Sequence, residues 1–391
     1  MKKSLLAMAA LMGVATLPAH AWRVNIDQET FADIGFSTIV RGIYEGKRND
    51  NSSVKNRLNF FVPLFNITAS GQVNKLVYFS MNAEGNSNTA TLGDNRVLVR
   101  DSFIGLKFAD EFRVQAGVMR VPFTRVALTS AYAQLFPYTP PFGALANQPT
   151  DVEAGGLSPR DHGIVVWGNV ADGLVKYYLG ITDGATIRRS DDDRLAYTIR
   201  LQFTPTMLGF KGETGYTLWD TYLGRQNVLS IGVGYRVVGR SGNNVRDTKM
   251  LTVDMLYEQK FGDIVPNLQV GYINQNDTRG NANERASQLY IQGGVLFDQM
   301  VGFGKPALAV RFEQNENRNI AGALANANDP RVTRFGVIGH YYIKGQAAKV
   351  SLGVDSVSLN SEARNRTCND YGVNGLCRNF TDITLQFQTQ F

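Results

Sequence analysis

The chain has 391 residues, a formal net charge of +6, 39 glycines and 10% aromatic residues. With three histidines in the chain, no further metal ligands lie near the two cysteines, and no Ser/His/Asp spacing or glycine-rich phosphate loop is present. Beyond its first residues the chain has no apolar stretch near the roughly 18 residues that a transmembrane helix needs. This composition suits a large all-β fold, including membrane barrels, in which only one face of each strand meets lipid.

Residues 1–21 have the pattern of a secretory signal peptide. Two lysines near the start are followed by an apolar run over 5–17, and the sequence Ala-His-Ala ends at Ala21. This arrangement of charge, apolar core and small residues is typical of signal peptides, and it is too short for a stop-transfer helix. We expect cleavage after Ala21, which leaves residues 22–391 as one barrel domain.

The rest of the chain is a series of segments of about ten residues with alternating polarity, separated by turns rich in Gly, Asn and Asp. We predict strands at 34–46, 57–70, 74–84, 96–109, 112–120, 161–170, 173–182, 193–204, 212–222, 226–238, 247–260, 265–275, 286–298, 306–315, 332–344, 347–359 and 379–391. Single-chain bacterial barrels normally have an even number of strands. One segment is therefore wrong or split, or one strand is missing, and we expect 16 strands, with 18 as the alternative.

The alternation gives each strand one apolar face and one polar face. In the last segment Ile383, Leu385 and Phe387 alternate with Thr384 and Gln386. Across the chain the polar face is rich in Arg and Gln, which suits a wall facing water better than a buried core. We therefore predict an all-β, transmembrane antiparallel β-barrel with lipid outside and water inside. A barrel of this size keeps an aqueous lumen.

A long interruption separates the strand ending near Arg120 from the strand starting near Asp161. These residues, 121–160, are apolar and aromatic, and a loop of this length is usually functional. We expect the loop to fold into the lumen as a constriction, with a short helix over 129–136 that prolines terminate. The alternative is a loop packed on the barrel rim or on a neighbouring subunit.

The connections predict the topology. We expect short turns at 109–111 and 171–173 on the periplasmic side, because such barrels keep their long loops outside. The expected extracellular loops are 185–193, 276–285, 315–331 and 360–378.

Cys368 and Cys377 lie close together in a polar stretch near the C-terminus. In an exported chain such a pair predicts one local disulfide. The alternative is two free thiols.

Residues 100–123, RDSFIGLKFADEFRVQAGVMRVPF, resemble a hairpin of the phosphate-selective porin O and P family. That family has an Asp-small-aromatic strand, a short turn and a Gly-x-x-Lys/Arg-x-Pro-Phe segment. Gly117, Arg120, Pro122 and Phe123 occupy the positions of that segment here.

Residues 160–185, RDHGIVVWGNVADGLVKYYLGITDGA, resemble the next hairpin of the same family. They contain Arg-Asp-x-Gly at the start and Tyr-x-Leu-Gly-x-x-x-Gly at the end, with Asp183 where the family often has Asn. The two passages cover roughly an eighth of the chain. The resemblance implies an outer-membrane porin that assembles as a homotrimer.

The chain has 27 arginines against 13 lysines. Guanidinium groups bind oxyanions through two parallel hydrogen bonds, and rings of Arg or Lys in a pore favour anions. The alternation and the long loop identify the candidate pore-lining, anion-selecting residues: Arg41, Arg120, Arg125, Arg200, Arg311 and Lys107, with Arg194 and Lys176 as further candidates. The alternative is a wall charged with both signs, because 34 acidic residues are also present.

Together these patterns predict a bacterial outer-membrane porin for passive diffusion of small polar solutes, with a preference for anions such as phosphate-like oxyanions. Its expected partners are these solutes, membrane lipid and lipopolysaccharide. We expect no nucleic acid, no cofactor, no metal and no enzymatic activity, since neither His162 nor His340 has a matching catalytic partner. The alternatives are a general or cation-preferring porin, a closed structural or surface-binding barrel, and a soluble secreted β-protein.

Overall fold

The computed structural model describes residues 22–47, 56–85, 97–137, 160–184, 194–239, 245–279, 282–318, 331–367 and 378–391. The predicted signal peptide, its cleavage site, Cys368 and Cys377 lie outside the described residues, as does the 138–159 part of the predicted constriction loop. Among the residues described, no helix combines the length and the apolar character needed to cross a membrane.

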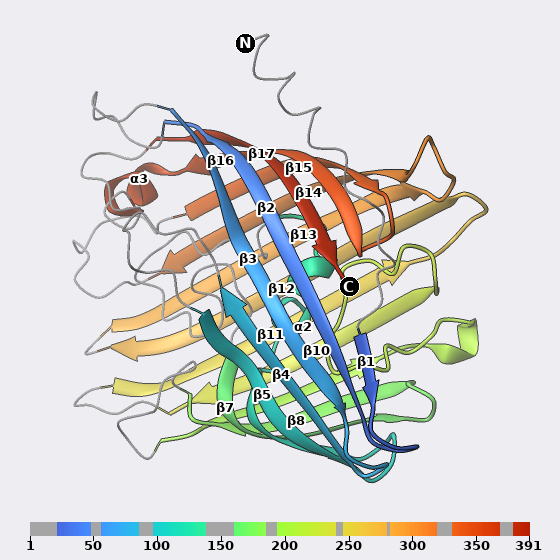
Figure 1. The fold of residues 1–391 in the computed structure, drawn as a ribbon. Coiled ribbons are helices and arrows are strands. Elements are labelled where there is room, and N and C mark those ends of the chain that lie inside the picture. The colour runs from blue at the N-terminus through green and yellow to red at the C-terminus, as the bar shows by residue number, and fades with distance from the viewer. Residues whose placement is uncertain are drawn as a thin grey trace.

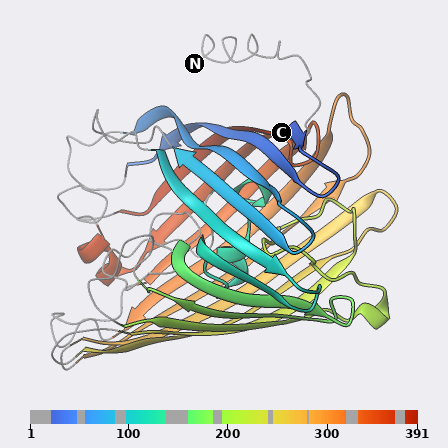
Figure 2. The ribbon, with the colours of Figure 1, turned by 60° about the horizontal axis from the view of Figure 1, so that its bottom comes forward.

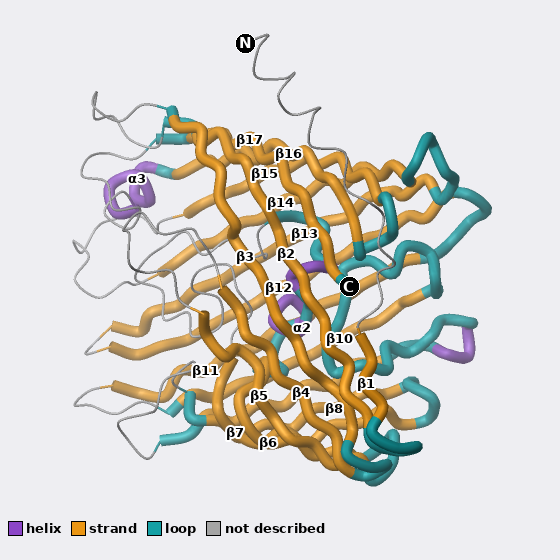
Figure 3. Tube along the Cα trace, viewed as in Figure 1, coloured by secondary structure: helices purple, strands orange, loops and turns teal. Residues whose placement is uncertain are grey.

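The chain is built almost entirely of β-strands (Figures 1 and 3). Its elements are β1 (Trp22–Asn25), β2 (Phe31–Glu45), β3 (Arg57–Gln72), β4 (Val77–Gly85), β5 (Val97–Lys107), β6 (Arg113–Arg120), α2 (Arg125–Leu128), η1 (Ala131–Ala133), β7 (Arg160–Val170), β8 (Val175–Thr182), β9 (Ala196–Phe203), η2 (Thr206–Leu208), β10 (Val228–Val238), β11 (Val245–Glu258), β12 (Ile264–Arg279), β13 (Ala282–Phe297), β14 (Lys305–Arg318), β15 (Arg331–Tyr342), β16 (Ala348–Leu359), α3 (Ser361–Thr367) and β17 (Phe380–Gln390).

Strands β2 to β17 form a closed antiparallel barrel of 16 strands. Each strand pairs with its neighbours in the chain, and β17 pairs with β2 to close the ring. At the seam the backbone N–H of Phe391 donates to the carbonyl of Phe36 at 2.9 Å, and their rings lie 5.8 Å apart. The extra strand β1 folds back on β2. The predicted transmembrane antiparallel β-barrel is therefore confirmed, with 16 strands and not 18.

Strand β9 shows why these residues form a barrel in lipid. Tyr197 and Leu201 point outward and are 53% and 50% exposed, whereas Arg200 points inward and is fully buried. The same alternation runs through the other strands, so the barrel carries an apolar band outside and polar side chains inside. A water-soluble barrel would have the reverse arrangement.

The predicted strand at 212–222 is wrong. Strand β9 pairs directly with β10, from Phe203↔Ile231 to Ala196↔Val238, and no strand lies between them. Residues 213–224 of this connection leave the wall and enter the lumen, whereas η2 in the same connection stays exposed. Within this stretch Glu213, Leu218 and Asp220 are buried, because they contact the wall or residues of the 121–137 segment.

The predicted loop at 276–285 is also wrong. Strands β12 and β13 continue through it and stay paired to Arg279↔Ala282. The predicted loop at 315–331 starts too early, since β14 continues to Arg318. Polar residues at these strand ends look like loop in the sequence, but a strand that extends beyond the membrane does not need an apolar face.

Candidate functional site: the lumen

Residues 121–137, here called the first insert, cross the inside of the barrel after β6 (Figures 1 and 2). The predicted helix over 129–136 is replaced by the short helices α2 and η1. Thr124 caps α2, because its hydroxyl oxygen accepts from the backbone N–H of Ala127 at 2.9 Å. The first insert reaches a distant part of the wall, where Lys349 of β16 donates to the carbonyl of Gln134 at 3.0 Å.

Apolar side chains of the first insert pack on the wall at several places. Leu128 is fully buried in a cluster with Trp167 of β7 and Tyr178 of β8. Further along, Leu135 and Phe136 pack against Ala309 and Ile338. Burying a large apolar side chain contributes roughly 1.5–3 kcal/mol. The first insert is therefore a packed part of the barrel interior.

Residues 213–224, here called the second insert, enter from the end of the barrel where the short turns lie (Figure 3). They run beside the first insert in a short parallel pairing. The N–H of Leu218 donates to the carbonyl of Leu128 at 2.9 Å, and the N–H of Ser130 donates to the carbonyl of Leu218 at 3.1 Å. The two inserts thus support each other in the middle of the lumen.

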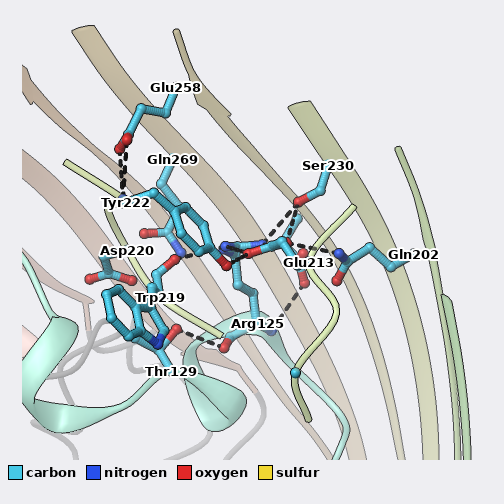
Figure 4. Close-up of polar contacts among 12 residues, drawn as sticks. Arg125, Thr129, Gln202, Glu213, Trp219, Asp220, Tyr222, Ser230, Glu258 and Gln269 are labelled. Carbon is cyan, nitrogen blue, oxygen red and sulfur yellow. Dashed lines mark hydrogen bonds and ion pairs between the residues drawn. The ribbon is translucent and has the colours of Figure 1, made fainter. Parts of the chain in front are cut away.

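A buried ion pair links the two inserts (Figure 4). The guanidinium of Arg125 donates to both carboxylate oxygens of Glu213, at 2.6 and 2.8 Å, and both side chains are 2% exposed or less. Gln202, Tyr222 and Ser230 also donate to this carboxylate. Burial opposes the charged form of Glu213, but the charge and hydrogen bonds of Arg125 outweigh it and lower the pKa of Glu213 to about 2.

Cationic side chains of the wall hold the backbone of both inserts, because they donate to main-chain carbonyls. The contacts are Arg41 to Pro137, Arg120 to Ala127 and Thr129, Arg200 to Phe123, Lys176 to Glu213, and Lys349 to Gln134. Hydrogen bonds to charged groups contribute more than neutral ones, about 1.5–3 kcal/mol each. Many of the lumen's positive charges therefore anchor the inserts.

Three of the predicted arginines lie in buried ion pairs. Arg125 binds Glu213, as described above. Arg200 binds both carboxylate oxygens of Asp254 at 2.7 Å, and Arg311 lies between two carboxylates, those of Glu313 at 3.0 Å and Asp355 at 3.3 Å. These guanidinium charges are neutralised by carboxylates inside the protein.

The remaining predicted positions lie in different surroundings. Arg41 is buried, and it binds Gln386 as well as Pro137. Lys107 lies at the end of β5, where it pairs with Asp110 of the following turn at 2.9 Å. Arg194 is half-exposed near the start of β9. Of the predicted residues, Arg120 lines a cavity between the wall and the inserts in the described part of the lumen.

This cavity has a volume of about 300 Å³ and is bounded by the wall from β2 to β7 and by both inserts. The residues that carry its polarity are Asn66, Asn82, Glu84, Asp101, Arg120 and Arg160. The register of the strands brings them to one level, through the pairs Asn66↔Glu84, Asn82↔Asp101 and Arg120↔Arg160.

The charges of the cavity are unequally paired. Arg100 lies 3.2 Å from Glu84, and Arg160 lies 3.1 Å from Asp101. Within the described part of the chain, Arg120 donates to two carbonyls, at 3.2 and 3.0 Å, and to no carboxylate. One positive charge in the cavity is thus left without a bonded carboxylate.

The sequence reasoning missed Arg160 and Asp101 as cavity residues. Arg160 is part of the Arg-Asp-x-Gly motif at the start of β7, and Asp101 stands beside Arg100 in the other family motif. Both residues lie at the level of the barrel where Arg120 ends β6, since Arg120 pairs with Arg160 and Val118 pairs with Ser102. The presence of these charged residues in both family motifs could therefore have indicated a site shared by the two hairpins.

A model of the phosphate-selective porin O and P family matches residues 40–276. The chain belongs to this family. An uncharacterized protein of Aquifex aeolicus (strain VF5) is 27% identical over 283 residues, a match that spans 66% of this chain and 62% of that protein. The chain thus matches less than two thirds of that relative's length.

Solved outer-membrane porins share the fold. OmpF of Salmonella typhi, in complex with daunomycin, has a TM-score of 0.60 at 16% identity and covers 95% of this chain and 100% of its own. An anion-selective porin from Comamonas acidovorans has a TM-score of 0.60 at 12% identity, with 93% and 100% covered. Family and fold together support an outer-membrane channel rather than an enzyme.

Proposed function

We propose that this chain is an outer-membrane porin through which small polar solutes diffuse passively, with a preference for anions. The observation that carries the proposal is Arg120, a cation that lines the open cavity while its neighbours Arg100 and Arg160 are paired with carboxylates. In this proposal the solutes pass through the lumen between the inserts and strands β2 to β7, where the cavity lies.

The physical basis is the strength of a fixed charge in a narrow pore. Charges attract one another more strongly where protein replaces part of the water, and a guanidinium offers paired donors to an oxyanion. The family is named for phosphate, and one solved porin with this fold is anion-selective. Both agree with a pore whose unneutralised charge is positive.

Recording in a planar bilayer with a potassium chloride gradient tests this function. We expect stepwise currents and a reversal potential that shows chloride passing more readily than potassium. A reversal potential of the opposite sign would favour the cation-preferring porin. In that case the carboxylates of Glu84 and Asp101, which also line the cavity, would set the preference. A barrel that inserts but passes no current would be the closed structural barrel.

We also propose that the barrel is a homotrimer in contact with lipid and lipopolysaccharide. OmpT, an outer membrane protein of Vibrio cholerae with a similar fold, has been solved in a trimer form, with a TM-score of 0.54 and 11% identity. Native mass spectrometry from mild detergent should give three copies of the chain. Monomers alone, under conditions that keep the barrel folded, would contradict the trimer.

A further inference from the structure

We propose that the cavity beside Arg120 binds a small organic anion that carries several hydroxyl groups, of the sugar-acid class. This inference rests on the proposed porin function and names the solute for the same site. It comes from the division of the cavity into two parts. The charged part is made by Glu84 at the end of β4 and by β5–β7, and the neutral, hydrogen-bonding part lies on β2, β3 and the middle of β4.

The charged part fits one oxyanion. Arg120 is the cation there without a bonded carboxylate in the described structure, whereas Arg160 is held by Asp101. A second anionic group on the solute would approach the carboxylates of Glu84 and Asp101, which also line the cavity. Like charges repel, so this second group would bind unfavourably. The site therefore favours a single carboxylate over a multiply charged anion.

The neutral part offers hydroxyl and amide groups. Ser37, Asn66, Thr68, Ser80 and Asn82 all line the cavity from adjacent strands. The register places them side by side, through Ser37↔Asn66 and Thr68↔Asn82. Groups of this kind both donate and accept hydrogen bonds, so they can replace the water around a solute's hydroxyl groups.

Two of these side chains have unused hydrogen-bonding capacity. Asn66 and Asn82 are 7% and 9% exposed, and the side-chain oxygen of each has no hydrogen-bond partner in the described structure. Buried polar atoms are normally paired, and an acceptor of this kind calls for a donor from water or from a ligand. Hydroxyl groups of a solute are such donors.

Inorganic phosphate would use only the charged part. A sugar acid uses both parts at once, since its carboxylate can reach Arg120 while its hydroxyl groups lie along β2–β4. The cavity volume of about 300 Å³ is sufficient for a six-carbon chain. We therefore expect polyhydroxylated anions to bind more tightly than apolar anions of equal length and charge.

Block of the single-channel chloride current tests the inference, with gluconate and hexanoate as probes. The two have the same number of carbons and the same charge, but only gluconate is polyhydroxylated. In the native chain we expect gluconate to reduce the current by half at about one tenth of the hexanoate concentration, a difference of about 1.4 kcal/mol. Inorganic phosphate should block less well than gluconate.

The double variant Asn66→Leu, Thr68→Val removes polarity and keeps volume and charge. We expect its gluconate-to-hexanoate ratio to fall to near one, with the chloride preference unchanged. Ser70→Ala, on the same strand but outside the cavity lining, is the matched control and should keep the tenfold ratio.

Equal block by gluconate and hexanoate in the native chain would overturn the inference, as would stronger block by inorganic phosphate. A double variant that keeps the full ratio would also overturn it. Each of these outcomes leaves the chloride preference of the pore in place. A native channel without that preference would instead overturn the anion preference in the proposed function.

Discussion

The Arg125–Glu213 pair joins two segments that enter the barrel from opposite ends. Its carboxylate also accepts from Gln202 and Ser230 of the wall, so the pair fastens both inserts to the strands. Removing one partner of a buried ion pair leaves an uncompensated charge, at a cost of roughly 3–5 kcal/mol. Arg125 is therefore a structural residue of the lumen, and its charge is not available to solutes.

Glu213→Gln should loosen the second insert. The variant keeps the shape of the side chain but leaves the guanidinium of Arg125 unpaired, so we expect a larger and noisier single-channel current. Glu29→Gln is the matched control, because Glu29 pairs with Lys75 at an exposed position and should be silent. A Glu213→Gln channel with native current and noise would show that the pair does not hold the insert.

The same carboxylate predicts a pH dependence. Its pKa is lowered to about 2 in the folded chain from an ordinary 4.5. A lowered pKa means that the pair stabilises fully above pH 4.5 and that its contribution is lost as the pH falls from 4.5 towards 2. We expect current noise to rise over that range in the native chain and to stay constant in Glu213→Gln.

The predicted disulfide between Cys368 and Cys377 stays a prediction. In the chain-entropy model, a cross-link that closes a loop this short raises the free energy of unfolding by about 2–3 kcal/mol. Mass spectrometry without reduction should find the two peptides joined. Alkylation of both thiols in the native protein would exclude the disulfide.

At the residue scale, the sequence could identify which arginines point into the lumen, but it could not identify the residues that each arginine contacts. Alternation placed Arg200 and Arg311 on the lumen face, where they lie. Asp254 and Asp355 come from other strands, β11 and β16, and the strand register brings them to Arg200 and Arg311, whereas Glu313 lies two residues along β14 from Arg311. Arg120 was found because a family motif and the long loop both pointed to it.

At the element scale, the period-2 pattern was sufficient wherever one face meets lipid and the other meets water. It failed at 212–222, where residues such as Leu218 and Asp220 are buried against protein inside the lumen although they belong to no strand of the wall. The first insert was predicted to enter the lumen from its length and apolar content. Its pairing with the second insert is a long-range contact that no local pattern encodes.

Replacing residues 211–225 by a short glycine-containing turn should widen the pore. The barrel should still form, since β9 and β10 pair directly along their length. We expect single-channel conductance to rise several-fold and larger neutral sugars to pass in liposome-swelling assays.

Replacing Thr206–Leu208 in the same connection is the control. This short η2 turn is exposed, with Met207 69% and Leu208 70% accessible, so its change should leave conductance as it is. Native conductance in the 211–225 replacement would show that the second insert does not narrow the path.

At the scale of the whole molecule, the barrel has two unlike ends. Short turns such as the one at Asp172, between β7 and β8, lie at one end, and α3 lies at the other (Figure 1). We expect a cysteine at Ser361 to be labelled by an impermeant reagent on intact cells and a cysteine at Asp172 to be protected. Labelling at Asp172 alone would mean that the barrel is inserted the other way round.

The central claim is that Arg120 gives the pore, at the cavity that the inserts leave open, its preference for anions. Reversal potentials in a salt gradient test it most directly, with Arg120→Glu compared against Lys107→Glu, which makes the same charge change outside the cavity. We predict that Arg120→Glu lowers the chloride-to-potassium permeability ratio at least several-fold, and that Lys107→Glu leaves it close to native. An unchanged ratio in a folded Arg120→Glu channel would contradict the claim.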